Sequence, residues 1–487
     1  MSLRSTIRSG IRSGIRSAAS ACAPSRGGAC ALPVLALFLC ACAVLPGPPS
    51  TDPISIARDA RSLVEPGLEG ACRRYAAGHT DKSTLLACGK WMFFYETFGT
   101  KGVPSSLPRF LVRAFTDEVG PGFSKYGLIE DPRSKDHLPY GMAPTKMTGL
   151  TSALGFTCAS CHIARLPDGR IAIGAPNHHY DYGKHILAMT LFPFLATSGP
   201  DKHSMDAVAA LQPLLDRLRA QPQIWAKLGG ALMRAMGAFK IPILSPATER
   251  GYATWPLGTQ DFLLAPLATD DDVEILGKIP PLFGLPREGE VKTASMIHGM
   301  YGWSGNAKTL ASFMHGFIEL GGGDPKKWPE QKLLPLIEYL YSLEAPRNPA
   351  RASADAIAAG KALFQSKGCL GCHDGPRHSG KRVYKFDEIG TDETLTRWMD
   401  PQHLGQPCCG AHLEDPLTRG VKSPRLTGLW LQRRFLHNGA LASLEQLFCL
   451  AARPKTVAPL GAEGHKQTCE GLSTVEKHAI IDYLRAL

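Results

Sequence analysis

Two short stretches of the chain each place two cysteines three positions apart, with a histidine directly after the second cysteine. They are Cys158, Cys161 and His162, and Cys369, Cys372 and His373. Two thiols at this spacing add to the two vinyl groups of a heme, and the adjoining imidazole binds the iron as the proximal ligand. A single Cys-x-x-Cys pair also occurs in redox and zinc sites. Because two complete copies occur in one chain, the sequence predicts two covalently attached c-type hemes.

Histidines downstream of the first motif are candidates for the ligand on the other face of its iron. The stretch GAPNHHYDYGKH contains His178, His179 and His185. An iron held between two histidines is closed, whereas an open sixth position binds O2 or peroxide. His178 is therefore either the ligand that closes this site or a hydrogen-bonded histidine of the loop, and the residues leave both readings open.

The second motif lies between two segments with the pattern of capped helices. Ser353 can cap a helix whose apolar positions run to Phe364 and which ends before Gly368. Near the C-terminus, Ser473 and Glu476 form a capping box that opens another helix. The apolar face of that helix is predicted from the spacing of Ile480, Tyr483, Leu484 and Leu487.

These two helices resemble the first and last helices of small class I cytochromes c. In that family the helices cross where a glycine of the first lets an aromatic residue of the last approach, and Gly360 and Tyr483 match those positions. The resemblance implies that residues 350–487 form a complete cytochrome c-like domain.

The ending of this domain recurs earlier in the chain. Residues 337–343 read IEYLYSL and residues 481–487 read IDYLRAL, and a Pro- and Asn-containing linker follows the first copy at 346–349. Together with the duplicated motif, the repeat predicts a mainly α fold of two tandem cytochrome c-like heme domains with long loops. Their predicted bounds are 43–346 and 350–487, and the first domain is enlarged by insertions.

The N-terminus has the pattern of a secretory signal. Residues 1–30 carry five arginines and no acid, and residues 31–39 are apolar. The four residues ending at Cys42 resemble a bacterial lipoprotein box, so 1–42 is predicted to be a signal peptide of the lipoprotein type; an anchor helix through Leu45 is the alternative. This predicts export, either to the periplasm, to a membrane surface facing it, or out of the cell. Removing the signal lowers the formal net charge from +11 to +6, so nucleic-acid binding is not predicted.

Six cysteines remain outside the signal and the two motifs. An even number of remaining cysteines in an exported protein predicts disulfides. Cys72 and Cys88 lie close together in the sequence and are expected to pair with each other. The other four are expected to pair among themselves, with buried free thiols as the alternative. They are Cys408, Cys409, Cys449 and Cys469.

Two longer stretches resemble the bacterial diheme cytochrome c peroxidase superfamily. They are KSPRLTGLW…FLHNGALASLEQL at 422–447 and YGWSGNAKTL at 301–310. The 211-residue spacing of the heme motifs, with FDEIGTD at 386–392, ARPKT at 452–456 and Gly464-His465, is similar to the rubber-oxygenase-like branch. The resemblance covers most of residues 80–487.

This resemblance implies axial and pocket residues. It makes His465 the sixth ligand of the second heme, with His437 and Met399 as alternatives, and His437 could instead contact the ligand sphere or a propionate. Trp398 or Trp430 are candidates for a position between the hemes, although the sequence itself does not place them. Relatives also hold a calcium ion between domains, whose ligands are not identifiable in this chain. The candidates for the distal pocket of the first heme are Trp303, His298, Phe313, His315 and Phe317.

The chain departs from the peroxidases at their acid–base positions. In the same register their glutamine is replaced by Phe313 and their glutamate by Gly323, although Glu319 or Asp324 could supply an acid. Cleavage of peroxide needs such a group, and an apolar pocket instead suits O2 beside a hydrophobic substrate.

The predicted function is therefore a diheme oxidoreductase that binds O2 or peroxide at the first heme, with the second heme in electron transfer. Its expected partners are a redox protein or a small oxidant and an apolar substrate. The alternative function is a non-enzymatic electron carrier whose two irons are both six-coordinate.

Overall fold

The structure is a computed structural model, and residues 52–487 form one compact unit. It describes residues 55–145, 152–221, 223–224, 244–261, 267–268, 276–288, 290, 301–303, 305, 307–380, 382–393, 420–455 and 461–487. None of the helices within these ranges has the length and apolar character that a membrane crossing requires.

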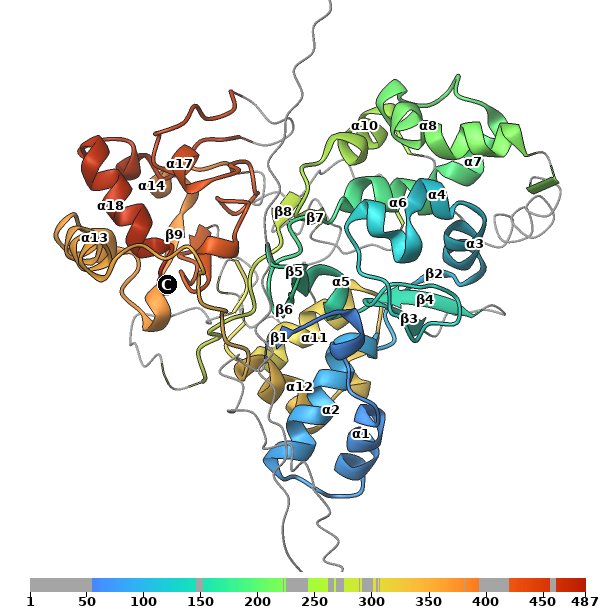
Figure 1. Cartoon of the computed structure of the whole chain (residues 1–487), viewed down its shortest axis with the longest axis horizontal. Coiled ribbons are helices and arrows are strands. Elements are labelled where there is room, and N and C mark those ends of the chain that lie inside the picture. The colour runs from blue at the N-terminus through green and yellow to red at the C-terminus, as the bar shows by residue number, and fades with distance from the viewer. Residues whose placement is uncertain are drawn as a thin grey trace, which may run out of the picture. The chain divides into compact units, whose positions relative to one another are not determined.

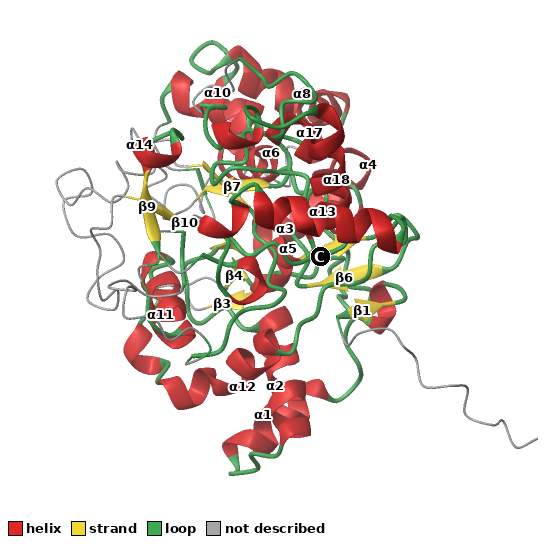
Figure 2. Cartoon of the chain, turned by 90° about the vertical axis from the view of Figure 1, so that its left-hand side faces the viewer, coloured by secondary structure: helices red, strands yellow, loops and turns green. Residues whose placement is uncertain are grey.

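The described chain is mainly helical, as the sequence predicted, with small antiparallel sheets (Figures 1 and 2). The α-helices are α1 (Leu68–Ala76), α2 (Lys82–Tyr95), α3 (Ser106–Ala114), α4 (Thr116–Val119), α5 (Cys158–His162), α6 (Tyr182–Thr190), α7 (Phe192–Ser198), α8 (Met205–Ala220), α10 (Pro246–Thr254), α11 (Leu310–Leu320), α12 (Glu330–Tyr341), α13 (Ala354–Ser366), α14 (Phe386–Ile389), α17 (Leu444–Leu447) and α18 (Thr474–Leu484). The 3-10 helices are η1 (Ala60–Ser62), η2 (Pro121–Tyr126), η3 (Pro325–Lys327), η4 (Cys369–Gly371), η5 (Pro376–His378), η7 (Leu429–Leu431) and η8 (Lys466–Thr468).

The strands form four small sheets. Their orders are β1-β6-β5, β2-β4-β3, β7-β8 and β10-β9, with every pair antiparallel. The strands are β1 (Ile56–Ala57), β2 (Val103–Pro104), β3 (Met142–Thr145), β4 (Ala153–Phe156), β5 (Ile163–Arg165), β6 (Ile171–Ile173), β7 (Thr259–Asp261), β8 (Leu276–Lys278), β9 (Val383–Lys385) and β10 (Gly420–Lys422).

The two helices predicted around the second motif form and cross as expected. The hydroxyl of Ser353 accepts a hydrogen bond from the first turn of α13, and Ser473 and Glu476 form the capping box of α18. A Cβ atom at Gly360 would lie 2.0 Å from the carbonyl oxygen of Ala479 and 2.8 Å from the Cβ atom of Tyr483. The absence of a side chain at Gly360 therefore sets how closely α13 and α18 pack.

The same crossing occurs between α2 and α12. A Cβ atom at Gly89 would lie 2.0 Å from the carbonyl oxygen of Pro335 and 2.5 Å from the Cβ atom of Tyr339. Tyr339 and Tyr483 hold equal positions in the repeated endings IEYLYSL and IDYLRAL. The two repeated endings therefore pack in the same way, and Gly89 is the glycine at the N-terminal crossing. The predicted domain boundary at 346–350 stays a prediction.

We expect Gly89→Val and Gly360→Val each to destabilise the protein by about 3 kcal/mol, because neither carbonyl can move away without separating two helices. Urea denaturation followed by circular dichroism measures the effect. Gly70→Ala, in a helix position where a Cβ atom meets only arginine ends at 3.7 Å, is the control and is expected to stabilise slightly. A valine tolerated at either crossing would contradict the close contact.

Two disulfides are present in the described chain. Cys72 and Cys88 join α1 to α2, as predicted, and Cys449 pairs with Cys469. The second pair agrees with the expectation that the C-terminal cysteines pair among themselves, and Cys408 and Cys409 lie outside the described residues.

Candidate cofactor sites

The four cysteines of the two motifs are all free thiols, in contrast to the cysteines in the disulfides. Burial raises the pKa of Cys158 and of Cys161 to about 12, so both are protonated thiols at neutral pH. The sulfur of Cys161 donates a hydrogen bond to Oε1 of Gln260 on β7, at 3.0 Å. The thiols that would form thioether bonds are therefore not engaged in disulfides.

The first motif forms the short helix α5, which leads directly into β5. Burial lowers the pKa of His162 to about 4, and the nearby Pro280 carbonyl partly opposes this effect. Nδ1 of His162 has no hydrogen-bond partner of normal geometry among the described residues. The ring is therefore neutral, as a metal-binding imidazole must be.

The loop after β6 returns to the first motif. The backbone N–H of Asn177 donates to the Cys161 carbonyl at 2.8 Å, and its side chain donates to the Gly127 carbonyl at 2.9 Å. Burial lowers the pKa of His178 to about 4, and Nδ1 of this ring has no partner among the described residues. No imidazole of the described chain makes a ring contact with His162, so ligation by His178 stays a prediction.

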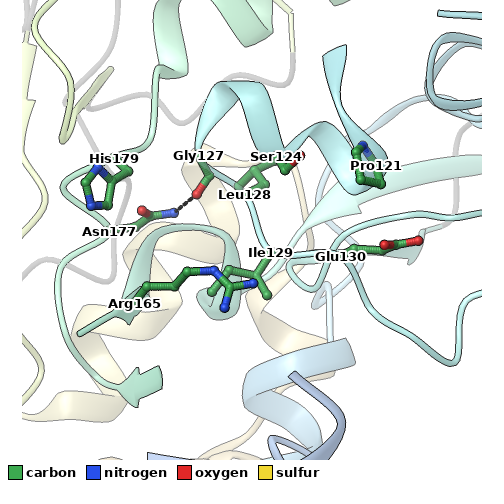
Figure 3. Close-up of a pocket in the computed structure, with 9 residues that line it drawn as sticks. All are labelled: Pro121, Ser124, Gly127, Leu128, Ile129, Glu130, Arg165, Asn177 and His179. Atoms are coloured by element: carbon green, nitrogen blue, oxygen red, sulfur yellow. Dashed lines mark hydrogen bonds between the residues drawn. The ribbon is translucent and has the colours of Figure 1, made fainter. Parts of the chain in front are cut away.

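Figure 3 shows a cavity of about 380 Å³ beside this loop. It is lined by Pro121, Ser124, Gly127, Leu128, Ile129, Glu130, Arg165, Asn177 and His179. His179 lines this cavity, whereas His185 is fully buried and its Nδ1 lies 2.9 Å from the Tyr180 hydroxyl. The three histidines of the stretch therefore have three different environments.

The second motif begins with η4, and its histidine is oriented by a backbone carbonyl. Nδ1 of His373 donates to the carbonyl of His378 at 2.9 Å. Nε2 of His378 is in turn 2.8 Å from the Tyr483 hydroxyl on α18. Because Nδ1 carries the proton, the lone pair of His373 is on Nε2, which is the atom that a proximal ligand presents to iron.

His465 faces His373. The two ring centroids are 6.4 Å apart and the planes are inclined by 38°. A metal–imidazole bond is about 2 Å long and an imidazole centre lies about 1.2 Å behind its nitrogen, so two imidazoles on opposite sides of one ion have centres roughly 6.3 Å apart. The chain would therefore accommodate a heme iron between these rings, although ligation itself stays a prediction.

The loop that carries His465 is held by Arg453, within the ARPKT stretch. The Arg453 guanidinium donates to the carbonyls of Gln446 at 3.0 Å, Leu447 at 2.8 Å and Gly464 at 2.7 Å. The disulfide of Cys469 with Cys449 closes the other side of the loop. Burial lowers the pKa of His465 to about 4, so its ring is neutral when it faces His373.

We expect Arg453→Met to destabilise the protein by about 2 kcal/mol, because three partly buried carbonyls lose a charged donor. Thermal unfolding compared with Lys466→Met, an exposed neighbour expected to change stability by less than about 0.5 kcal/mol, measures this. Equal melting temperatures of the two variants would contradict the role of Arg453.

The other predicted ligands of the second heme lie elsewhere. His437 is buried with its ring centroid 5.7 Å from that of Phe386, and it makes no ring contact with His373. Trp430 donates to the Pro346 carbonyl at 2.8 Å. Met399 and Trp398 lie outside the described residues.

The predicted distal-pocket residues are only partly brought together. Phe313 and Phe317 stack edge to face on α11, with centroids 4.8 Å apart and both rings partly exposed. Trp303 lies beneath the ammonium of Lys278, 5.4 Å from its ring centre. Nε2 of His315 hydrogen-bonds the Trp328 carbonyl at 2.6 Å, and His298 lies outside the described residues.

The two candidate acids are not part of the Phe313–Phe317 pair. Asp324 caps η3 by accepting a hydrogen bond from the Lys326 backbone. Glu319 follows Phe317 by two residues, about 200° around the helix, so it projects from the opposite side of α11. One carboxylate oxygen of Glu319 is buried there without a partner among the described residues. The apolar character of the Phe313 face is therefore unchanged by either acid.

Sequence reasoning missed several residues that position these sites. Gln260 and the His378 carbonyl bind the motifs directly, and Arg453 holds the His465 loop. It also missed the buried Lys278 and Lys422. A comparison of the chain with itself would have found the two lysines, because they begin two similar segments, KIPPLFGL at 278–285 and KSPRLTGL at 422–429.

Comparisons with known proteins assign no family. No protein-family profile and no curated protein sequence matches the chain. Among solved structures, one similarity is to hydrazine synthase of Kuenenia stuttgartiensis pressurised with xenon, with a TM-score of 0.26 and 17% identity over 49% of this chain and 79% of that chain. This similarity is too distant to assign a function.

Proposed function

We propose that the chain is an exported diheme c-type cytochrome with oxidoreductase activity. The observation that carries the proposal is the facing pair His373 and His465, one of which directly follows two free thiols at heme-attachment spacing. A heme at each motif would supply a one-electron iron couple and, where an axial position is open, a place for O2 or peroxide.

The two sites would have different tasks. At the second, Cys369 and Cys372 would attach the heme, and His373 and His465 would close both faces, which suits electron transfer. At the first, Cys158, Cys161 and His162 would hold the heme. The ring contacts of the described residues include none that pairs an imidazole with His162, which favours an open site there.

An apolar substrate or O2 would fit the first site better than a reaction that needs proton transfer. Phe313 and Phe317 offer partly exposed rings, and the candidate acid Glu319 projects from the other side of α11. The two disulfides support folding in an oxidising compartment outside the cytoplasm.

Spectroscopy and mass spectrometry of the mature protein test this proposal. We expect a mass that includes two porphyrins, and oxidised spectra with one low-spin and one high-spin heme, of which the reduced high-spin heme binds carbon monoxide. The paired changes of Cys158 and Cys161 to Ala should remove only the high-spin component. A protein without heme would overturn the proposal, and two low-spin hemes that exclude carbon monoxide in both oxidation states would instead make it an electron carrier.

A further inference from the structure

A row of aromatic side chains leads away from the first motif. Tyr180 and Tyr182 have ring centroids 5.8 Å apart, and Tyr182 stacks on Trp255 with centroids 6.0 Å apart and planes inclined by 12°. Tyr252 ends the row, with its ring centroid 4.3 Å from that of Trp255. All of these side chains are buried. Phenol and indole rings can give up a single electron, so contacts between them form a path along which an electron can move.

The inner end of the row lies near the sulfur of Cys161. Tyr180 and Cys161 belong to the same buried apolar cluster. The backbone N–H of Asn177 donates to the Cys161 carbonyl at 2.8 Å, and the Asn177 carbonyl accepts from the Tyr180 N–H at 3.1 Å. Burial and, after it, the charge of the Cys161 sulfur raise the pKa of Tyr180, so the hydroxyl and the sulfur are within electrostatic reach of each other. The sulfur that would carry the first heme therefore has an oxidisable ring beside it.

The hydroxyl of Tyr180 is paired with a histidine. It lies 2.9 Å from Nδ1 of His185, and neither side chain has any exposed surface. A phenol that loses an electron becomes a strong acid, so its oxidation needs a base at hydrogen-bond distance. Burial lowers the pKa of His185 to about 3, but an oxidised phenol is a far stronger acid, so the proton still moves to the ring.

The surroundings of His185 keep this proton within the pair. The rings of Phe123 and Phe156 lie 4.7 Å and 5.9 Å from the ring of His185, between centroids. Nε2 of His185 has no hydrogen-bond partner among the described residues. A proton that moves from Tyr180 to Nδ1 therefore returns by the same hydrogen bond when the tyrosine regains its electron.

The outer end of the row lies just beneath the surface. Trp255 is 7% exposed and lies between the exposed residues Thr254 and Leu257. A Cβ atom at Gly183 would lie 1.9 Å from the carbonyl oxygen of Tyr252, so α6 and α10, which carry most of the row, are in close contact. An electron that enters at the surface can therefore reach the inner end of the row through ring contacts alone.

We propose that Tyr180 is a redox-active tyrosine of the first site and that His185 takes its proton. Tyr182 and Trp255 carry the replacement electron inward from the surface. This inference rests on the proposed function, with hydrogen peroxide as the oxidant. Peroxide takes two electrons and two protons at the first site and is reduced to water, with one electron from the iron and one from Tyr180.

The oxidation of Tyr180 breaks its O–H bond. The electron goes to the heme and the proton goes to Nδ1 of His185, which leaves a neutral phenoxyl radical beside an imidazolium. An electron passed from Trp255 through Tyr182 then restores the phenol, and His185 returns the proton. A one-electron donor in solution, such as a phenol, replaces the electron of Trp255. Donors too large to reach the heme can thus be oxidised at the surface.

Freeze-quenched EPR of the mature protein tests the proposal, with hydrogen peroxide as the oxidant in one arm and photogenerated tris(bipyridine)ruthenium(III) in the other. We expect a tyrosyl radical in both arms. Tyr180→Phe should abolish the peroxide-generated radical while keeping the ring that packs in the row. His185→Gln keeps a polar partner but removes the base, so the radical should form about 100-fold more slowly. Trp255→Phe leaves the pair intact, so its peroxide-generated radical should persist longer.

Tyr339→Phe is the matched control, because it removes the hydroxyl of a buried tyrosine that has no hydrogen-bond partner among the described residues. Its radical yield should equal that of the wild type. The proposal is overturned if Tyr180→Phe and His185→Gln carry both hemes but match this control in both arms. A first heme whose optical spectrum does not respond to peroxide would instead contradict the proposed open site, and the ruthenium arm then still decides the role of Tyr180.

Discussion

His465→Ala is expected to convert the second heme from low spin to high spin while leaving it attached. In the proposed function the covalent links would be to Cys369 and Cys372, so attachment would not depend on His465, whose ring would supply the opposite ligand. Without that ring the iron loses one strong-field nitrogen and becomes accessible to water and added ligands. EPR and optical spectra should show complete loss of the low-spin signal.

His437→Ala is the control that distinguishes the two histidines predicted for this ligand. The ring of His437 contacts Phe386, whereas His465 faces His373 at 6.4 Å between centroids. The His437 variant should keep the low-spin signal, and added imidazole should restore that signal in the His465 variant. If His437→Ala loses the signal and His465→Ala keeps it, the assignment is wrong.

The stability of the protein is expected to fall steeply as the pH drops below about 6.5. Burial lowers the pKa of His185 to about 3 and that of His437 to about 4 in the folded state. Their unfolded pKa is about 6.5, so between these values the unfolded chain binds more protons than the folded chain. The contribution of each histidine to the free energy of unfolding is therefore greatest above about pH 6.5 and is about 2 kcal/mol smaller at pH 5.

Urea denaturation at pH 7.5, 6 and 5 measures this dependence, and His185→Gln isolates one histidine. The variant lacks the titrating ring but keeps a polar group for Tyr180. Its free energy of unfolding should therefore fall by about 2 kcal/mol less than that of the wild type between pH 7.5 and pH 5. His79→Gln, at an exposed position, should leave the slope unchanged. Parallel stability curves for wild type and His185→Gln would show that this ring does not carry the effect.

Features set by neighbouring residues were predictable from sequence. The caps at Ser353 and Ser473 depend on hydrogen bonds within one helical turn, and the thiol spacing of the motifs is local as well. The crossing at Gly360 and the choice of His465 came from resemblance to known families. The contact of His465 with His373 joins residues 92 positions apart, which no periodicity in this chain indicates.

Features set by distant contacts were missed or left open. Gly89 is one glycine within an ordinary helical segment, and only the approach of α12 gives it a role. Four C-terminal cysteines allow three pairings, so the Cys449–Cys469 disulfide was not singled out in advance. Lys278 and Lys422 are visible as a repeat, but charge alone predicts solvent exposure, and their burial follows from packing between the two segments.

The two helix crossings differ greatly in the length of chain that each must enclose. Helices α13 and α18 both lie in the C-terminal stretch of the chain. Helix α2 lies near the N-terminus and can form its crossing only after α12, which begins at Glu330, has been synthesised. Contacts between distant parts of a chain form slowly because loop closure costs entropy. The thiols of the first motif are therefore synthesised long before the helix that packs on α2, and under the proposed function they would stay accessible for heme attachment for longer than those of the second.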